Sequence, residues 1–284
     1  MPGEPRAELV EVDGVRVFCR RLDGDGTPTV FVHGNPTNSG QWLPVLERMR
    51  GPAIALDLPG WGSSERPPDF DYSFAGLARF FGRFLDALGL ERYRLCAHDW
   101  GALALIEAQR RPEGLERLVL IDAVPLLTGY RWHWVARRFW RRQPLGELFN
   151  ATLTRAGFAV GFRQARGDRR AMPSWFVDMV WRGIDAGTKR AILTLYRSAD
   201  PEKLASAGVD LDRLDCPALV VWGTRDPYLP LRFGRMYAER LPGAELVEVE
   251  GAGHWPWIER PEVIERLVSF LEPEQDGAGN RDGA

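Results

Sequence analysis

A carboxylate stands at the centre of a sharp strand-to-helix turn in this sequence. The pentapeptide Ala97-His98-Asp99-Trp100-Gly101 lies between an apolar run, Tyr93 to Cys96, and a helix-like stretch, Ala102 to Arg110. Small residues at both ends allow such a turn, because the backbone and the neighbouring strand crowd it. A serine at the centre would attack carbonyl carbon, whereas an ionised Asp attacks only carbon that carries a good leaving group. Asp99 therefore indicates alkyl electrophiles such as haloalkanes or epoxides.

Residues that directly follow strand-like runs are the ones that can converge on Asp99. In open α/β sheets the ligand crevice lies beyond the carboxyl ends of the strands. Three further segments stand there: His33-Gly34-Asn35-Pro36, Asp226 and His254. Their order along the chain, nucleophile then acid then histidine, is that of an α/β-hydrolase triad.

The elements that must position these residues alternate between strand and helix. Two short β-type runs flank Asp13-Gly14, a hairpin signal, and buried-strand runs then alternate with helical patterns at 41–50, 74–88 and 102–111. Such alternation predicts the α/β class, with a mostly parallel central sheet flanked by helices. The expected strands are 8–12, 15–20, 29–32, 53–56, 93–96, 118–121, 218–222 and 245–249.

The strand pattern breaks in the second half of the chain. Between 125 and 211, tryptophans and arginines are interspersed and no strand run occurs, which predicts an inserted helical lid. We therefore expect an α/β-hydrolase core at 1–124 and 212–272. A last helix is expected at 261–271, and the polar, Gly-rich end at 273–284 is expected to be disordered.

Composition and charge exclude several function classes. The chain has 284 residues, 45% of them hydrophobic, and a formal charge of −2. This balance predicts neither nucleic acid nor a membrane as a partner. The start lacks an apolar signal core and no run approaches the roughly 20 apolar residues of a membrane span, so we expect a cytoplasmic protein. Cys19, Cys96 and Cys216 are expected to be reduced thiols of the core.

Each candidate residue has a plainer structural interpretation. Asp99 could cap the following helix, and His254 could be an ordinary surface histidine. Asp226-Pro227 could form a simple turn, in which case Asp122, after the preceding strand, is the substitute acid. We interpret His33 as a loop brace and His98 as support for the turn. Asp57 is assigned to a structural turn.

Five ordered motifs carry a resemblance that covers nearly the whole chain. They resemble the α/β-hydrolase superfamily, and within it the aspartate-nucleophile branch of haloalkane dehalogenases and epoxide hydrolases. The motifs are His33-Gly34-Asn35-Pro36-Thr37, Asp57-Leu58-Pro59-Gly60-Trp61-Gly62-Ser63-Ser64, His98-Asp99-Trp100-Gly101, Trp222-Gly223-Thr224-Arg225-Asp226-Pro227 and Gly251-Ala252-Gly253-His254-Trp255.

The resemblance implies a two-step hydrolysis without a cofactor or metal. Asp99 displaces the leaving group and forms an alkyl ester, and His254, oriented by Asp226, deprotonates the water that releases it. The backbone N–H groups of Asn35 and Trp100 are expected to stabilise the oxyanion. The expected substrate is a small apolar electrophile, together with water.

Stabilisation of the leaving group separates the two branches. A halide needs N–H donors, which the Asn35 amide and the Trp100 indole would supply. An epoxide oxygen needs a proton, which epoxide hydrolases donate from lid tyrosines. Leu193-Thr194-Leu195-Tyr196-Arg197 resembles the segment that carries one of them, which implies Tyr196 as the candidate acid and leaves Tyr130 as a less clear second one. Because Asn35 and Trp100 together fit a halide, we place haloalkane dehalogenase first and epoxide hydrolase as the alternative. A non-catalytic small-molecule receptor is a remote third interpretation. Substrate size, stereochemistry, oligomeric state and physiological role are not readable from the sequence.

Overall fold

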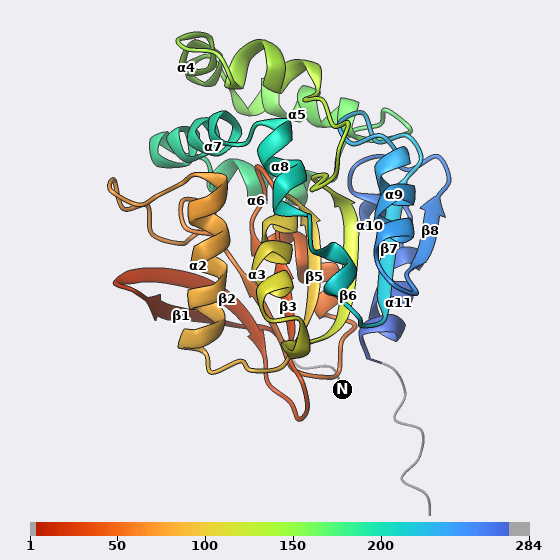
Figure 1. The fold of residues 1–284 in the computed structure, drawn as a ribbon. Helices are drawn as coiled ribbons and strands as arrows, with labels where there is room; N and C mark the ends of the chain where they lie inside the picture. The colour runs from red at the N-terminus through yellow and green to blue at the C-terminus, as the bar shows by residue number, and fades with distance from the viewer. Residues whose placement is uncertain (1–3, 273–284) are drawn as a thin grey trace, which may run out of the picture.

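An eight-stranded sheet forms the centre of residues 4–272, the part of the chain that the computed structural model describes (Figure 1). The strands are β1 (Arg6–Val12), β2 (Val15–Leu22), β3 (Thr29–Val32), β4 (Ala53–Leu56), β5 (Tyr93–Asp99), β6 (Leu115–Ala123), β7 (Ala218–Gly223) and β8 (Glu245–Val249). Their order in the sheet is β1-β2-β4-β3-β5-β6-β7-β8. The β1–β2 and β2–β4 pairs are antiparallel, and the other neighbours are parallel. The predicted α/β-hydrolase fold is confirmed.

Helices cover both faces of the sheet. The core helices are η1 (Ser39–Trp42), α1 (Leu43–Leu46), α2 (Phe74–Ala87), η2 (Trp100–Leu103), α3 (Ala104–Arg110), η3 (Pro112–Gly114), α9 (Arg232–Arg240), α10 (Pro256–Glu259) and α11 (Glu262–Leu271). In β3, Val30 and Val32 join one apolar cluster, whereas Phe31 joins the other. Successive strand side chains point to opposite faces, so a strand that is apolar throughout must be covered on both sides. α2 and α3 pack into the first cluster, and α1 and α11 into the second.

A helical region is inserted between β6 and β7. It comprises η4 (Ala136–Trp140), α4 (Leu145–Ala151), α5 (Arg155–Ala165), α6 (Ser174–Arg182), α7 (Ala186–Ser198), α8 (Pro201–Ala207) and η5 (Leu211–Arg213). Several of these helices lie over one end of the sheet, at the top of Figure 1. The predicted helical insertion is confirmed. We call residues 125–211 of this region, which end within η5, the lid.

Two expectations from the sequence need comment. The helix expected at 41–50 is shorter, because after α1 the chain tightens into turns in which the N–H groups of Arg48 and Met49 donate to the carbonyls of Val45 and Leu46. The chain then reverses toward β4 at Gly51. The expected disordered end, 273–284, lies outside the described residues.

The three cysteines lie in the core of the protein. Cys19, Cys96 and Cys216 are all buried and unpaired, as expected for core thiols. No helix in the described part of the chain is long and apolar enough to cross a membrane.

Replacement of Gly101 tests whether the turn after β5 needs a small residue. A Cβ at Gly101 would lie 2.3 Å from the Val32 carbonyl oxygen, which belongs to the neighbouring strand and cannot move freely. We expect Gly101→Ala to lower the free energy of unfolding by about 3 kcal/mol. Urea denaturation measures this loss.

Gly161 offers the matched control. It lies within α5, and a Cβ added there meets no atom within 4 Å. Gly161→Ala should be neutral or stabilise the protein by up to about 1 kcal/mol, because alanine favours the helix. Equal effects of the two substitutions would contradict the steric argument.

Candidate active site

The turn between β5 and η2 presents Asp99 at the end of the sheet. Asp99 has φ 50° and ψ −118°, a strained conformation for a residue with a side chain. A Cβ on Gly34 would lie 2.3 Å from the Asp99 Cβ, so the two loops approach closely at this glycine. Asp99 as a whole residue is only 5% exposed. The sequence therefore folds a buried carboxylate into the place from which a nucleophile can reach a substrate.

The two oxygens of Asp99 have different surroundings. Oδ2 accepts a hydrogen bond of 2.7 Å from the backbone N–H of Asn35. Oδ1 lies 3.9 Å from Nε2 of His254. Burial raises the pKa of Asp99 from its ordinary value near 3.8 to about 6, although His254 and the backbone N–H groups of Asn35 and Trp100 oppose the shift. Oδ2 is thus held by a backbone donor, while Oδ1 faces His254.

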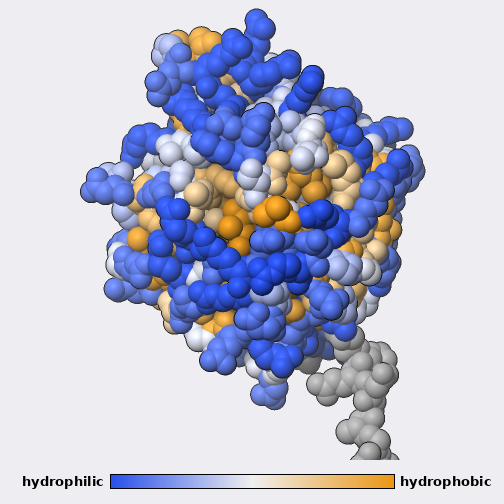
Figure 2. Space-filling view, in the orientation of Figure 1, coloured by the Kyte–Doolittle hydropathy of each residue, from blue (hydrophilic) through white to orange (hydrophobic). Residues whose placement is uncertain are grey.

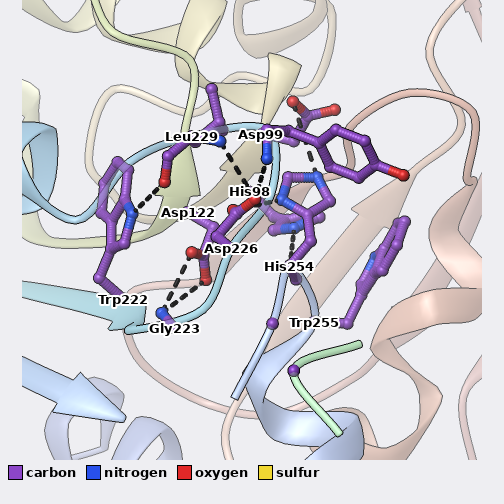
Figure 3. Close-up of polar contacts among 12 residues, drawn as sticks. His98, Asp99, Asp122, Trp222, Gly223, Asp226, Leu229, His254 and Trp255 are labelled. Atoms are coloured by element: carbon purple, nitrogen blue, oxygen red, sulfur yellow. Dashed lines mark hydrogen bonds and ion pairs between the residues drawn. The ribbon is translucent and has the colours of Figure 1, made fainter. Parts of the chain in front are cut away.

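His254 bridges Asp99 and Asp226. Its Nδ1 lies 2.7 Å from Oδ2 of Asp226 (Figure 3), and the second carboxylate oxygen accepts from the backbone N–H groups of Tyr228 and Leu229 at 2.7 and 3.1 Å. Burial disfavours the imidazolium, but Asp226 and Asp99 outweigh burial and raise the pKa of His254. The structure therefore brings Asp99, Asp226 and His254 together, in the geometry of a base held by an acid.

Asp122, the substitute acid considered from the sequence, lies in the same group. It is fully buried at the end of β6, and both its oxygens face the backbone N–H of Gly223, at 3.1 and 3.3 Å. A carboxylate oxygen of Asp122, a carboxylate oxygen of Asp226 and a ring nitrogen of His254 lie within 4.8 Å of one another. Burial and the charge of Asp226 raise the pKa of Asp122 well above its ordinary value.

This group could be considered as a metal site, but its donors are already engaged. His254 uses Nδ1 toward Asp226, and the Asp226 oxygens accept from two backbone N–H groups. A cation would have to replace these hydrogen bonds. The contacts fit proton transfer better than metal binding.

Two further histidines and Asp57 have supporting positions. The ring of His33 bonds the Gly34 carbonyl through Nδ1 and accepts from the Leu58 N–H through Nε2. His98 donates through Nε2 to the His254 carbonyl at 2.9 Å, and burial keeps its pKa well below the ordinary value. Asp57 accepts from the backbone N–H groups of Ser39 and Ser63. These contacts brace the loops around the site.

Two buried side-chain donors beside Asp99 lack an acceptor. Nδ2 of Asn35 and Nε1 of Trp100 make no hydrogen bond. The indole N–H of Trp61 donates to Oδ1 of Asn35 at 3.2 Å, which fixes the amide so that its NH₂ is the free end. Both donors lie near the Tyr196 oxygen without making a hydrogen bond to it, and their proximity partly offsets the rise in the pKa of Tyr196 that burial causes. Asn35, Trp100 and Tyr196 thus form one polar cluster at the nucleophile.

A cavity of about 320 Å³ opens between this cluster and the lid. Most of its lining is aromatic or aliphatic, and the polar exceptions include Asp99, His254, Tyr130 and Tyr196. The Tyr130 hydroxyl is buried and makes no hydrogen bond. Both lid tyrosines expected from the sequence therefore line the cavity that contains Asp99.

A larger groove of about 700 Å³ lies between α2, α3 and α8. On the face drawn in Figure 2, hydrophobic side chains gather below the lid and charged ones surround them. The groove lining mixes small apolar residues with charged ones such as Glu107 and Lys203, and none of it belongs to the group around Asp99. We therefore assign the chemistry to the smaller cavity.

His133 is a cavity residue that the sequence reasoning missed. Its ring centroid lies 5.0 Å from that of Tyr228 and 6.2 Å from that of Tyr196. Burial lowers the pKa of His133 to about 4, so the imidazole is neutral at physiological pH. The available signal was its rarity, because the chain has only four histidines and the other three were assigned.

Comparisons with known proteins agree with this geometry. Residues 29–267 match the model of the alpha/beta hydrolase family. The chain is 29% identical over 270 residues to a 2-hydroxymuconate semialdehyde hydrolase of Pseudomonas putida, covering 89% of each protein. It is 28% identical to haloalkane dehalogenase 2 of Mycobacterium tuberculosis, covering 87% of this chain and 88% of the relative.

Among solved structures, the epoxide hydrolase CorEH without ligand superposes with a TM-score of 0.76. The identity is 23%, and the match covers 94% of this chain and 98% of that one. At this identity the likeness concerns the fold alone.

The buried charge of Asp99 predicts a pH-dependent cost to stability. Its folded pKa lies about two units above the ordinary value, so the native state binds the proton more tightly between about pH 4 and 6. The contribution of this group is therefore most favourable at low pH and is lost as the pH rises through about 6. Asp99→Asn should raise the free energy of unfolding at pH 7.5 by 1 to 3 kcal/mol, roughly the value of two pKa units.

Urea denaturation at several pH values measures this effect. The gain should disappear below about pH 4, where Asp99 is protonated in both states. Asp69→Asn, at an exposed position, is the control, and it should not change the free energy of unfolding at pH 7.5 or below pH 4. A gain that is independent of pH would contradict a buried ionised nucleophile.

Proposed function

This chain belongs to the alpha/beta hydrolase family, and from that premise we propose that it hydrolyses haloalkanes through an alkyl ester on Asp99. The nucleophile is inferred from its chemistry. A carboxylate on the turn can displace a leaving group from a saturated carbon. A serine at that position would instead attack a carbonyl carbon and form an acyl ester. The names of the relatives do not separate the chemistries, because they include hydrolases of different bonds.

In the first step Oδ1 of Asp99 attacks the carbon that carries the halogen. The C–O bond forms as the C–X bond breaks, and the halide leaves with the electron pair. Oδ2 remains as the carbonyl oxygen of the ester, bonded to the Asn35 N–H, where that donor can later stabilise an oxyanion. Burial strips water from the carboxylate, which favours attack.

In the second step water attacks the carbonyl carbon of the ester, which is Cγ of Asp99. His254, with Nε2 3.9 Å from Oδ1, leaves space for a water molecule and takes its proton. Asp226 stabilises the imidazolium through Nδ1. Collapse of the tetrahedral intermediate releases the alcohol and restores the carboxylate, so the products are an alcohol, a halide ion and a proton.

The observation that carries the choice of substrate is the pair of unpaired donors. A buried N–H without an acceptor costs about 1 to 3 kcal/mol, so two such groups beside the nucleophile favour an anion that accepts from both. Neither an amide nor an indole can give up its proton to an alkoxide at neutral pH. The pair therefore suits a halide better than an epoxide oxygen.

Epoxide hydrolysis is the second candidate, and the lid tyrosines favour it. Tyr196 lies at the same place as the two N–H donors, and its hydroxyl can deliver a proton to an opening epoxide. Donation from Asn35 and Trp100 would stabilise the phenolate that results. Tyr130, with its unpaired hydroxyl, is available as a second donor.

The size and lining of the cavity restrict either substrate. About 320 Å³ of mainly aromatic and aliphatic surface suits a small apolar molecule. Binding without any turnover would instead support a receptor on this fold, the third interpretation.

Trapping of the ester tests the nucleophile for both candidates. His254→Phe removes the base but leaves Asp99 free to attack, so the alkyl group should stay on Asp99 after incubation with 1,2-dibromoethane or styrene oxide. Mass spectrometry of the peptide that contains Asp99 detects the adduct. Asp99→Ala is the control and should carry none; an intact peptide in His254→Phe with both compounds would refute the assignment.

Product analysis separates the two candidates. With 1,2-dibromoethane we expect bromide release, which Trp100→Phe should slow by about 10²-fold because it removes one anion donor and keeps a ring. Trp175→Phe, on the exposed side of α6, is the control and should not change the rate of bromide release. With styrene oxide we expect no diol.

The opposite pattern would favour the epoxide candidate. Diol formation that is lost in Tyr196→Phe and retained in Tyr72→Phe, whose hydroxyl bonds Pro67 outside the cavity, would reverse the order of the two candidates.

A further inference from the structure

We propose that Asp122 is held as a neutral carboxylic acid whose hydroxyl donates to the Asp226 carboxylate, which makes Asp122 a positioning residue for the acid and base of the site. The proposal rests on the proposed function only in taking His254 as the base. It concerns a residue that is none of Asp99, Asp226 and His254 and that does not line the cavity.

The first argument is that two buried carboxyl groups in contact cannot both be ionised. Asp122 is fully buried, and the side chain of Asp226 is also shielded from solvent. One oxygen of each carboxyl group and one ring nitrogen of His254 lie within 4.8 Å of one another. The two carboxyl groups are close enough to share a hydrogen bond. Like charges at that distance raise one of the two pKa values strongly, so one proton stays between them.

The second argument is a count of donors, which decides where the proton resides. Asp226 accepts from Nδ1 of His254 and from the backbone N–H groups of Tyr228 and Leu229. Asp122 receives one backbone N–H, that of Gly223, shared between its two oxygens. Three donors stabilise the charge on Asp226, and a single donor faces Asp122. The negative charge therefore belongs to Asp226 and the proton to Asp122.

The backbone at Asp122 supports a specific role for its side chain. Its φ is 37°, in the left-handed region that a residue with a Cβ occupies at a cost. The next residues tie this strand end to the nucleophile, because the Val124 N–H donates to the Asp99 carbonyl at 2.9 Å. The strained position thus joins the β6 end, the acid loop and the nucleophile turn.

None of the other titratable groups around Asp122 and Asp226 supplies a proton to this pair. Asp99 faces His254 from the end of β5, and His98 packs against His254 with ring centroids 4.7 Å apart. Burial lowers the pKa values of His98 and of the lid residue His133, so both are neutral. The pKa values of Tyr130 and Tyr228 are raised by burial. Asp122 and Asp226 therefore carry one negative charge between them.

A neutral Asp122 has an effect on His254 that an ionised one would not have. By donating to Asp226 it reduces the negative charge that the imidazole meets, and it fixes the carboxylate toward Nδ1. Loss of this donor leaves Asp226 more negative and should raise the pKa of His254. Loss of an ionised Asp122 would remove a negative charge and lower it. The direction of the shift distinguishes the two states.

The experiment compares the purified full chain with Asp122→Asn and Asp122→Leu. Asparagine keeps both contacts of a protonated acid, since its NH₂ can donate to Asp226 and its carbonyl can accept from Gly223, and it tolerates a positive φ. Nuclear magnetic resonance titration of the His254 ring should give an unchanged pKa in Asp122→Asn and a pKa raised by about one unit in Asp122→Leu. Infrared spectra at neutral pH should show the C=O stretch of a protonated acid that Asp122→Asn lacks.

Kinetics supply a second readout once a substrate is known. Asp122→Leu should slow release of the ester by about 10-fold or more, and Asp122→Asn should restore most of that loss. If Asp122→Leu does not fold, the asparagine variant still decides the question. A lowered His254 pKa in Asp122→Asn, or an infrared spectrum without the band in the parent protein, would overturn the proposal.

Asp57 provides the matched control, because it is also buried and accepts backbone hydrogen bonds, but in a loop where it bonds Ser39 and Ser63. Asp57→Asn should leave the band and the His254 titration in place. The spectroscopic readouts need no substrate, so their failure is separable from failure of the proposed reaction.

Discussion

The charge of a buried carboxylate is the constraint on which the site depends. Asp99 is nearly inaccessible to water, and an ionised group in such a place needs donors that the protein itself supplies. Two such donors come from separate loops, the Asn35 N–H after β3 and the Trp100 N–H after β5, and the His254 ring after β8 adds a charge partner 3.9 Å from Oδ1. The sheet order places β3 and β5 side by side, which lets the first two donors meet the same carboxylate. The fold thus offsets part of the cost of burying this carboxylate.

Much of the core was predictable from sequence because its signals are local. Fully buried strands are continuous apolar runs in the sequence, and the residues at their carboxyl ends converge. This predicts without coordinates that Asp99, Asp226 and His254 lie together. The lid was predictable only as helical. His133 reaches the cavity through the tertiary packing of the lid, which the sequence pattern does not determine. Likewise, only coordinates reveal that Trp61 fixes the Asn35 amide.

Hydrogen bonds and ring contacts join the lid to the loops that carry His254 and Asp99. The His254 N–H donates to the carbonyl of Ala165 at the end of α5, and the carboxylate of Glu259 accepts from Gly167 and Gly253 on the two sides of that junction. Trp132 stacks on Trp100 with ring centroids 5.3 Å apart. A displacement of the lid would therefore disturb both His254 and the Trp100 ring beside Asp99. These contacts couple the shape of the cavity to the geometry of the candidate site.

The charges also give the proposed reaction an internal order. Before attack, Asp99 and Asp226 both raise the pKa of His254, which favours a protonated ring. Ester formation removes the charge of Asp99, so one of the two supports for the imidazolium disappears and burial pulls the His254 pKa down. The ring then becomes a free base at the stage when water must lose a proton. A neutral Asp122 keeps this change large, because a second fixed charge beside Asp226 would hold the imidazolium in place after Asp99 had been alkylated.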